Sequence, residues 1–180
     1  LNRYERSTGK FYRYSHDPDD PDSLSHNFVL SIHEGADGKY FWIGTMGGGL
    51  NRFDPSAGVF KCYTTTDGLP NNVVYNILED EDGYLWFSTN KGLCRFDPVT
   101  GDCFNYDQND GLQSNEFNFN AYYKSREGEL FFGGVNGFNA FFPGVVSPNP
   151  HKPPVVITDF YLFNQPVPIG KGPGGRVVLE

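Results

Sequence analysis

The sequence predicts an all-β protein made of repeated four-stranded antiparallel sheets, and three observations lead to this prediction. Gly and Pro supply 22 and 13 of the 180 residues, and both destabilise helix interiors while suiting turns. Phe and Tyr supply another 17 and 11 residues, and aromatic side chains favour strands. The chain also repeats itself with a period of about 44 residues, which is typical of propeller blades and of helical-pair repeats.

The repeat is visible as two segments that align over most of their length. Leu24–Asp54 matches Leu69–Asp97, with Trp42 opposite Trp86. A weaker third copy keeps the same Gly and aromatic landmarks but has Phe131 in place of the Trp. This third copy runs from Leu112 to Pro143, and the tail of a preceding copy occupies Leu1–Tyr14.

Within one copy, runs of strand-forming residues alternate with turn residues. Asp-Gly and Asn-x-Gly between such runs are typical of hairpins, because Gly tolerates the positive φ that tight turns require. Four strands in a simple meander form a β-propeller blade, so we expect a partial β-propeller rather than helical pairs. In the second copy the expected strands are Val73–Glu79, Tyr84–Thr89, Leu93–Phe96 and Cys103–Tyr106.

The recurring aromatic residues are expected to fill the space between neighbouring blades. Trp42, Trp86 and Phe131 occupy equivalent positions and are interpreted as core. Cys103 lies where the other copies carry Phe11 and Phe60, so it is expected to be a small buried side chain. The three cysteines permit one disulfide without requiring it, and their spacing does not match a zinc site.

The charge and hydropathy of the chain exclude several partners. A formal net charge of −8 makes nucleic-acid binding improbable. No apolar run approaches the ~20 residues of a membrane helix, so no membrane contact is expected within this segment. The first ten residues lack the apolar stretch of a secretory leader.

The unit GLPNNVVYNILEDEDGYLWFSTNKGLCRFDP resembles the two-component regulator propeller repeat. The segment FFGGVNGFNAFFPGVVSPNPHKPPVVITDFYLFNQPVPIG is similar to a last propeller blade followed by the start of a triple-tyrosine domain, an immunoglobulin-like module. The resemblance therefore implies a partial β-propeller of four-stranded antiparallel blades followed by the first strands of an immunoglobulin-like domain. The implied divisions are a preceding blade's tail (1–23), blades at 24–68 and 69–111, a last blade at 112–147, and a linker with the incomplete triple-tyrosine domain at 148–180.

The resemblance also implies a function. Such regions are the periplasmic sensors of hybrid two-component regulators, so we expect a non-catalytic segment that recognises an oligosaccharide and relays the signal across the membrane to a histidine kinase. Two alternatives remain open, namely a propeller lyase or glycosidase acting on polysaccharide, and a purely structural or dimerisation segment. An incomplete ring would expose apolar blade faces, so a homodimer or other self-association is also expected.

Candidate ligand residues are those that vary between copies, because a ligand breaks the symmetry of the repeat. Asn27, Asn72 and Asn115 recur and are interpreted as turn-forming residues that bond local backbone. The loops between blades and the turns joining second and third strands lie on the same rim. Varying residues there are His26, Met46, Asn71, Asn90, Lys91, Ser114 and Asn136, whose amides and cation suit sugar hydroxyls or an acidic sugar. Ordinary solvated loops are the competing interpretation for each of them.

Catalytic and cofactor chemistry find little support in the sequence. The four histidines show no close pairing and no nucleophile elbow is present, so neither catalytic residues nor a cofactor are predicted. No metal site is predicted either, although the acidic loop Asp17–Asp22 is a weak calcium candidate. The turn at Asp80–Gly83 lacks the calcium-loop pattern and is interpreted as a hairpin.

Overall fold

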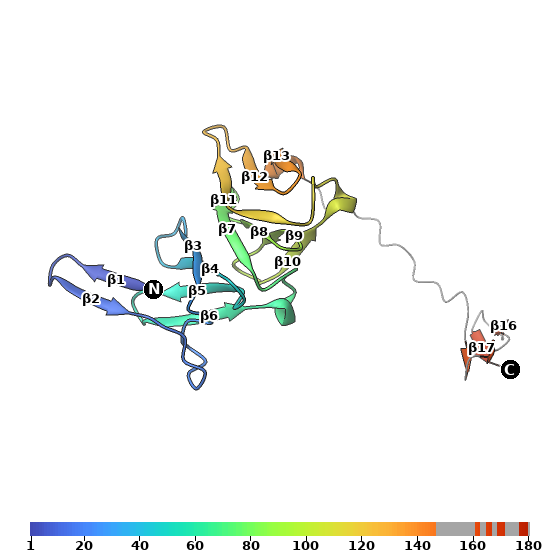
Figure 1. Cartoon of the computed structure of the whole chain (residues 1–180), viewed down its shortest axis with the longest axis horizontal. Coiled ribbons are helices and arrows are strands. Elements are labelled where there is room, and N and C mark those ends of the chain that lie inside the picture. The colour runs from blue at the N-terminus through green and yellow to red at the C-terminus, as the bar shows by residue number, and fades with distance from the viewer. Residues whose placement is uncertain (147–160, 163–164, 167–168, 172–176, 180) are drawn as a thin grey trace. The chain divides into compact units, whose positions relative to one another are not determined.

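A computed structural model describes residues 1–146, 161–162, 165–166, 169–171 and 177–179 (Figure 1). The chain forms two compact units, Leu1–Ser147 and Pro148–Glu180. Within the described residues the first unit consists of antiparallel strands and three short 3-10 helices, and it contains no α-helix. The predicted all-β fold is therefore confirmed.

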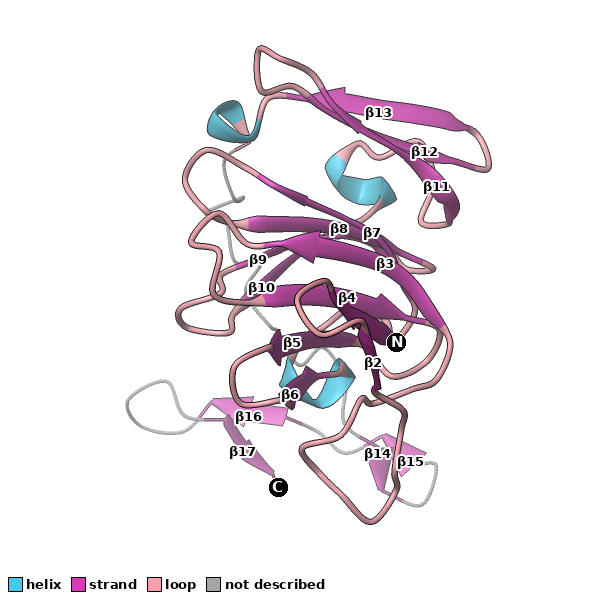
Figure 2. Ribbon diagram, turned by 90° about the vertical axis from the view of Figure 1, so that its left-hand side faces the viewer, coloured by secondary structure: helices cyan, strands magenta, loops and turns pink. Residues whose placement is uncertain are grey.

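Two complete four-stranded sheets form the centre of the first unit. A third sheet has three strands, and a two-stranded hairpin precedes them all. Figure 2 shows the second sheet lying between the first and the third, which is the face-to-face stacking of propeller blades. The strands are β1 (Asn2–Glu5) and β2 (Lys10–Arg13) in the hairpin; β3 (Val29–Glu34), β4 (Phe41–Thr45), β5 (Leu50–Asp54) and β6 (Val59–Tyr63) in the first sheet; β7 (Val74–Glu79), β8 (Leu85–Thr89), β9 (Gly92–Phe96) and β10 (Cys103–Tyr106) in the second; and β11 (Phe117–Lys124), β12 (Leu130–Gly134) and β13 (Gly137–Phe141) in the third.

The cores lie between the sheets, as the repeat predicts. Trp42 of the first sheet is 4% exposed and packs edge-on against Phe96 of the second sheet, with ring centroids 5.6 Å apart. Trp86 of the second sheet is 1% exposed and contacts Phe141 of the third at 4.9 Å. Phe131 differs, because it is only half-buried: its face of the third sheet is not covered by another described sheet.

The connections between sheets repeat with the same hydrogen bonds. Helices η1 (Thr65–Asp67) and η2 (Gln108–Asp110) each begin with a capping box, and η3 (Pro143–Val145) follows β13. The recurring asparagines hold these connections, because each side-chain oxygen accepts a backbone N–H from the preceding loop. The pairs are His16 with Asn27 (2.9 Å), Thr65 with Asn72 (2.8 Å) and Gln108 with Asn115 (2.8 Å), which agrees with the turn-forming interpretation.

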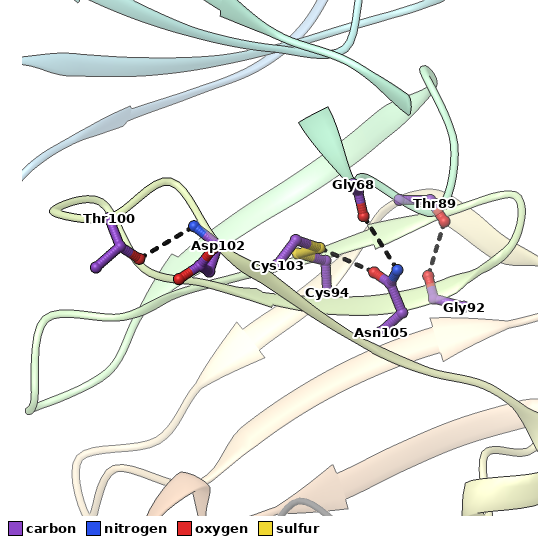
Figure 3. Close-up of a disulfide and its surroundings, with 8 residues drawn as sticks. All are labelled: Gly68, Thr89, Gly92, Cys94, Thr100, Asp102, Cys103 and Asn105. Carbon is purple, nitrogen blue, oxygen red and sulfur yellow. Dashed lines mark hydrogen bonds between the residues drawn. A yellow bond between two sulfur atoms is a disulfide. The ribbon is translucent and has the colours of Figure 1, made fainter. Parts of the chain in front are cut away.

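The cysteines correct one expectation from the sequence. Cys103 is not an isolated buried side chain: it is half-buried and forms a disulfide with Cys94 on the neighbouring strand (Figure 3). Cys94 lies opposite Asn105 and Cys103 opposite Phe96, so the two sulfurs meet diagonally across the β9–β10 ladder. Cys62 is the free cysteine and is half-buried.

The position of Cys94 has a local explanation in the repeat. In the first and third sheets the equivalent residues are Asn51 and Asn139, whose side-chain oxygens accept the backbone N–H groups of Ser25 and Gln113, both at 3.0 Å. The matching residue in the second copy is Pro70, which has no N–H to donate. An amide acceptor is therefore not needed there, and Cys94 can pair with a sulfur instead.

The disulfide gives a direct test by thiol counting. Unfolded protein alkylated without reductant is expected to carry one label, on Cys62, and three labels after reduction. Burial raises the pKa of the Cys62 thiol, so its alkylation in the native state at pH 8 should be slower than that of a free model thiol. Reduction should lower the free energy of unfolding by about 2–3 kcal/mol, because it opens a loop that spans nine residues of separation. Three labels without reductant, measured by mass spectrometry, would contradict the pairing.

The second unit is described only in part. Strand β14 (Tyr161–Leu162) pairs with β15 (Gln165–Pro166), and β16 (Ile169–Lys171) pairs with β17 (Val177–Leu179). The sequence of this region predicts two strands, Val155–Phe163 and Arg176–Leu179. β17 falls within the second of them, while most of the first lies outside the described residues. The linker prolines at 148, 150, 153 and 154 also lie outside them. The assignment to a triple-tyrosine domain and the division of the chain into blades stay predictions.

Candidate ligand-binding rim

One rim of the stacked sheets gathers the loops that enter each sheet and the turns between second and third strands. The turn between β4 and β5 of the first sheet contacts the loop that leads into β7 of the second sheet. Met46 pairs with Val73, and the N–H groups of Gly47 and Gly49 donate to the Asn72 carbonyl at 3.0 and 2.8 Å. The next turn repeats the contact, since Gly92 N–H donates to Asn115 O at 2.7 Å. Neighbouring blades are thus joined along this rim, and the candidate residues lie in these elements.

Three candidates share a structural role, and each lies in the loop that leads into the first strand of a sheet. His26, Asn71 and Ser114 occupy equivalent positions, and each accepts the backbone N–H two residues further on, as in an Asx or Ser/Thr turn. The donors are Phe28 for His26 (3.1 Å), Val73 for Asn71 (2.7 Å) and Glu116 for Ser114 (3.2 Å). Ser114 is 7% exposed, so it offers a ligand little surface; His26 and Asn71 are half-buried.

The candidates in the short turns are exposed. Met46 is 43% exposed, and the Asn90 side-chain oxygen accepts the Tyr75 hydroxyl at 2.7 Å. The backbone N–H of Asn136 donates to Gln113 Oε1 at 2.8 Å. Among the described residues the Lys91 ammonium has no hydrogen-bond partner. The rim therefore presents one cation and amide groups to solvent.

The first strand of each sheet has a feature that was not predicted from the sequence. Each of β3, β7 and β11 carries a β-bulge near its start. In β11 the bulge exposes Phe119 and its two neighbours Asn118 and Asn120. A change of repeat spacing was the available clue, because the offset is 43 between Asn72 and Asn115 but 45 between Trp86 and Phe131.

Among the described residues, His33 Nε2 lies 2.9 Å from Glu79 Oε2, and the groups with shifted pKa values do not lie together. A hydrogen bond from the Ser56 hydroxyl lowers the pKa of Asp54, while burial raises the pKa of Tyr106, and these two residues lie in different sheets. Across residues 1–146 and the short described strands beyond, no three His, Cys, Asp or Glu side chains are placed to hold a metal ion. In the acidic loop, Asp17 and Asp20 instead accept the backbone N–H groups of Asp19 and Asp22, both at 3.0 Å.

Comparisons with known proteins agree with the repeat. A family model for the two-component regulator propeller matches residues 23–47 and 68–91. A histidine kinase P4 of Formosa agariphila is 34% identical over 113 residues, which are 63% of this chain and 8% of that protein. Among solved structures, the extracellular domain assigned to a hybrid two-component system of B. thetaiotaomicron matches with a TM-score of 0.66 and 22% identity, over 80% of this chain and 20% of that one. The virginiamycin B lyase of Staphylococcus aureus matches with a TM-score of 0.55 and 18% identity, over 97% of this chain and 54% of that one.

Stacked four-stranded meanders with a buried Trp on the second strand define the molecule as a set of β-propeller blades. The matched repeats, at residues 23–47 and 68–91, are similar to those of the two-component regulator propeller. The chain spans less than a tenth of the histidine kinase and a fifth of the extracellular domain that it resembles.

Proposed function

We propose that this chain is a non-catalytic, ligand-sensing segment of a hybrid two-component regulator, and that its ligand is an oligosaccharide. The observation that carries the proposal is the rim, where exposed amides and a lysine lie in neighbouring turns and the Tyr75 hydroxyl donates to Asn90. Amides donate and accept hydrogen bonds at fixed geometry, which suits the paired donor and acceptor character of sugar hydroxyls. The exposed Lys91 would also suit an acidic sugar.

The setting in the whole protein is part of the same proposal. The structural neighbour from B. thetaiotaomicron is an extracellular domain, which supports a periplasmic location for this segment. No helix among the described residues is long and apolar enough to cross a membrane. We propose that the relay to a histidine kinase is carried by parts of the protein outside this segment.

Calorimetry against defined oligosaccharides tests the ligand. A panel of neutral α- and β-linked gluco-oligosaccharides and of uronic-acid oligosaccharides should include at least one binder, and the recovered sugar should be unchanged. New reducing ends or unsaturated products would favour the alternative, a propeller lyase or glycosidase. Absence of binding across a panel extended to other glycans would remove the oligosaccharide from the proposal.

We also propose that the chain self-associates through the outer face of the third sheet. Tyr123 and Phe138 are 61% and 67% exposed there and line an apolar cavity of about 300 Å³ together with Phe131. The residue equivalent to Phe138 in the second sheet is Leu93, which is 1% exposed because the third sheet covers it. An exposed aromatic face of this kind drives association.

Sedimentation velocity at several protein concentrations is expected to show a concentration-dependent oligomer. Phe138→Ser should shift the distribution toward monomer, because it makes the apolar face polar. Val99→Ser is the control, since Val99 is 91% exposed in a turn and lies outside that face. A monomer at every concentration for the unaltered chain would contradict self-association.

A further inference from the structure

We propose that the bulge of β11 is the element that contacts the sugar, with the Phe119 ring as a platform and the Asn118 and Asn120 amides beside it. This inference rests on the proposed recognition of an oligosaccharide and names the place where it occurs. It adds Asn118, Phe119 and Asn120 to the candidate residues of the rim. The repeat motif in the sequence does not single out any of the three.

The bulge of β11 breaks the symmetry of the blades. All three inner strands shift register at the same point, but β3 and β7 carry a single extra residue there, Leu30 and Tyr75. In β11 the shift spans Phe117 to Tyr122, and the spacing of the repeat grows by two residues, from 43 to 45. A ligand that lacks the symmetry of the repeat must be contacted by residues that differ between the blades. β-Bulges commonly change the direction of side chains beside functional sites.

A buried side chain holds the bulge in one conformation. Asn76 of the second sheet is fully buried, and its amide bonds both flanks of Phe119. Its Nδ2 donates to the Asn118 carbonyl at 2.9 Å, and its Oδ1 accepts the Asn120 N–H at 3.0 Å. The backbone on both sides of Phe119 is therefore held in place by hydrogen bonds. Such preorganisation favours binding.

The backbone of the bulge is strained at Asn120. Asn120 has φ of +59°, and among the described residues it is the one non-glycine residue with a positive φ. Strained backbone of this kind is concentrated at binding and catalytic sites. The Phe119 ring is 50% exposed although Phe favours burial, so the strain does not serve to bury an apolar group.

The chemistry of the bulge fits a pyranose ring. The aromatic face carries negative charge density, which attracts the positively polarised C–H groups on one face of a sugar. Asn118 and Asn120 flank Phe119 in the chain and are exposed, and their amides can donate to and accept from the hydroxyls of a sugar. At the equivalent point of the second sheet the Tyr75 hydroxyl is already bonded to Asn90, so β11 offers the freer aromatic group.

The test compares variants by calorimetry with the tightest-binding oligosaccharide from the neutral and uronic-acid panel. Phe119→Ala is expected to weaken binding at least tenfold, and Phe119→Trp to preserve it. Phe104→Ala is the matched control, because Phe104 is similarly exposed (47%) but lies on β10, the last strand of the second sheet. This substitution should leave the affinity unchanged. Circular dichroism melting of each variant checks that the fold is retained.

Two further variants separate contact from positioning. Asn120→Gly keeps the positive φ but removes the amide, so binding should weaken while the melting temperature holds or rises. Asn76→Ala touches no ligand and should weaken binding by releasing the bulge, with faster hydrogen exchange at the Asn120 N–H as its signature. If the unaltered chain binds a sugar and Phe119→Ala binds equally well, the inference is overturned and the proposed function stands. If the unaltered chain binds none, both fall.

Discussion

Trp86→Ala is expected to lower the free energy of unfolding by about 4 kcal/mol, the typical cost of truncating a buried Trp. Trp86 is 1% exposed, stacks on Tyr106 at 5.5 Å and contacts Phe141 of the next sheet at 4.9 Å. Its Nε1 donates to Asp80 Oδ2 at 2.8 Å, so truncation also leaves a buried carboxylate oxygen without its donor. Because small domains are stable by only about 5–15 kcal/mol, the loss should be visible as a large shift in urea unfolding.

Trp86→Phe provides the comparison for this prediction. The third sheet already carries Phe131 at the equivalent position, so the phenyl ring fits the blade pattern. We expect a smaller loss, about 1–2 kcal/mol, from the lost volume and the missing indole donor. A loss below about 1 kcal/mol for Trp86→Ala would mean that the interface between the second and third sheets contributes little to stability.

Gly92→Ala is expected to prevent normal folding or to cost more than about 3 kcal/mol, since both the backbone and the packing oppose a methyl group there. Gly92 has φ of +92°, which L side chains rarely adopt. A Cβ at this position would lie 2.0 Å from the Tyr106 carbonyl oxygen, so the ladder between β9 and β10 would have to shift. The equivalent Gly49 has the same relation to Tyr63, with φ of +74° and a Cβ distance of 2.0 Å.

Gly111→Ala separates the cost of the backbone conformation from the cost of the close contact. Gly111 also has a positive φ, +100°, but a Cβ there would meet no atom within 4 Å. Its cost should be limited to the backbone term of about 1–2 kcal/mol. Thermal unfolding followed by circular dichroism, with the soluble fraction on expression, measures both variants, and equal losses for Gly92→Ala and Gly111→Ala would show that the close contact is relieved at no cost.

The candidate site could be predicted from the sequence only in part. Its rim follows from topology, because alternate turns of a meander share an edge. Met46, Asn90, Lys91 and Asn136 are exposed, while their role in binding stays a prediction. The sequence did not predict that His26, Asn71 and Ser114 each accept a hydrogen bond from the backbone N–H two residues further on. Side chains such as Asn and Ser commonly form such bonds in turns. The bulge at Phe119 was recorded in the sequence as a change in spacing, but the clamp by Asn76 joins residues more than 40 positions apart.

By itself the sequence determined the all-β class, the repeated antiparallel sheets, their turns and the buried tryptophans. Each of these depends on patterns repeated within about 44 residues, namely strand-forming runs, turn glycines and the period of the aromatic residues. Only the tertiary structure decided that Cys94 pairs with Cys103, that Ser114 is buried and that Asn76 holds the bulge of β11. These depend on diagonal contacts across a ladder and on contacts between sheets, and residue spacing does not fix either of them.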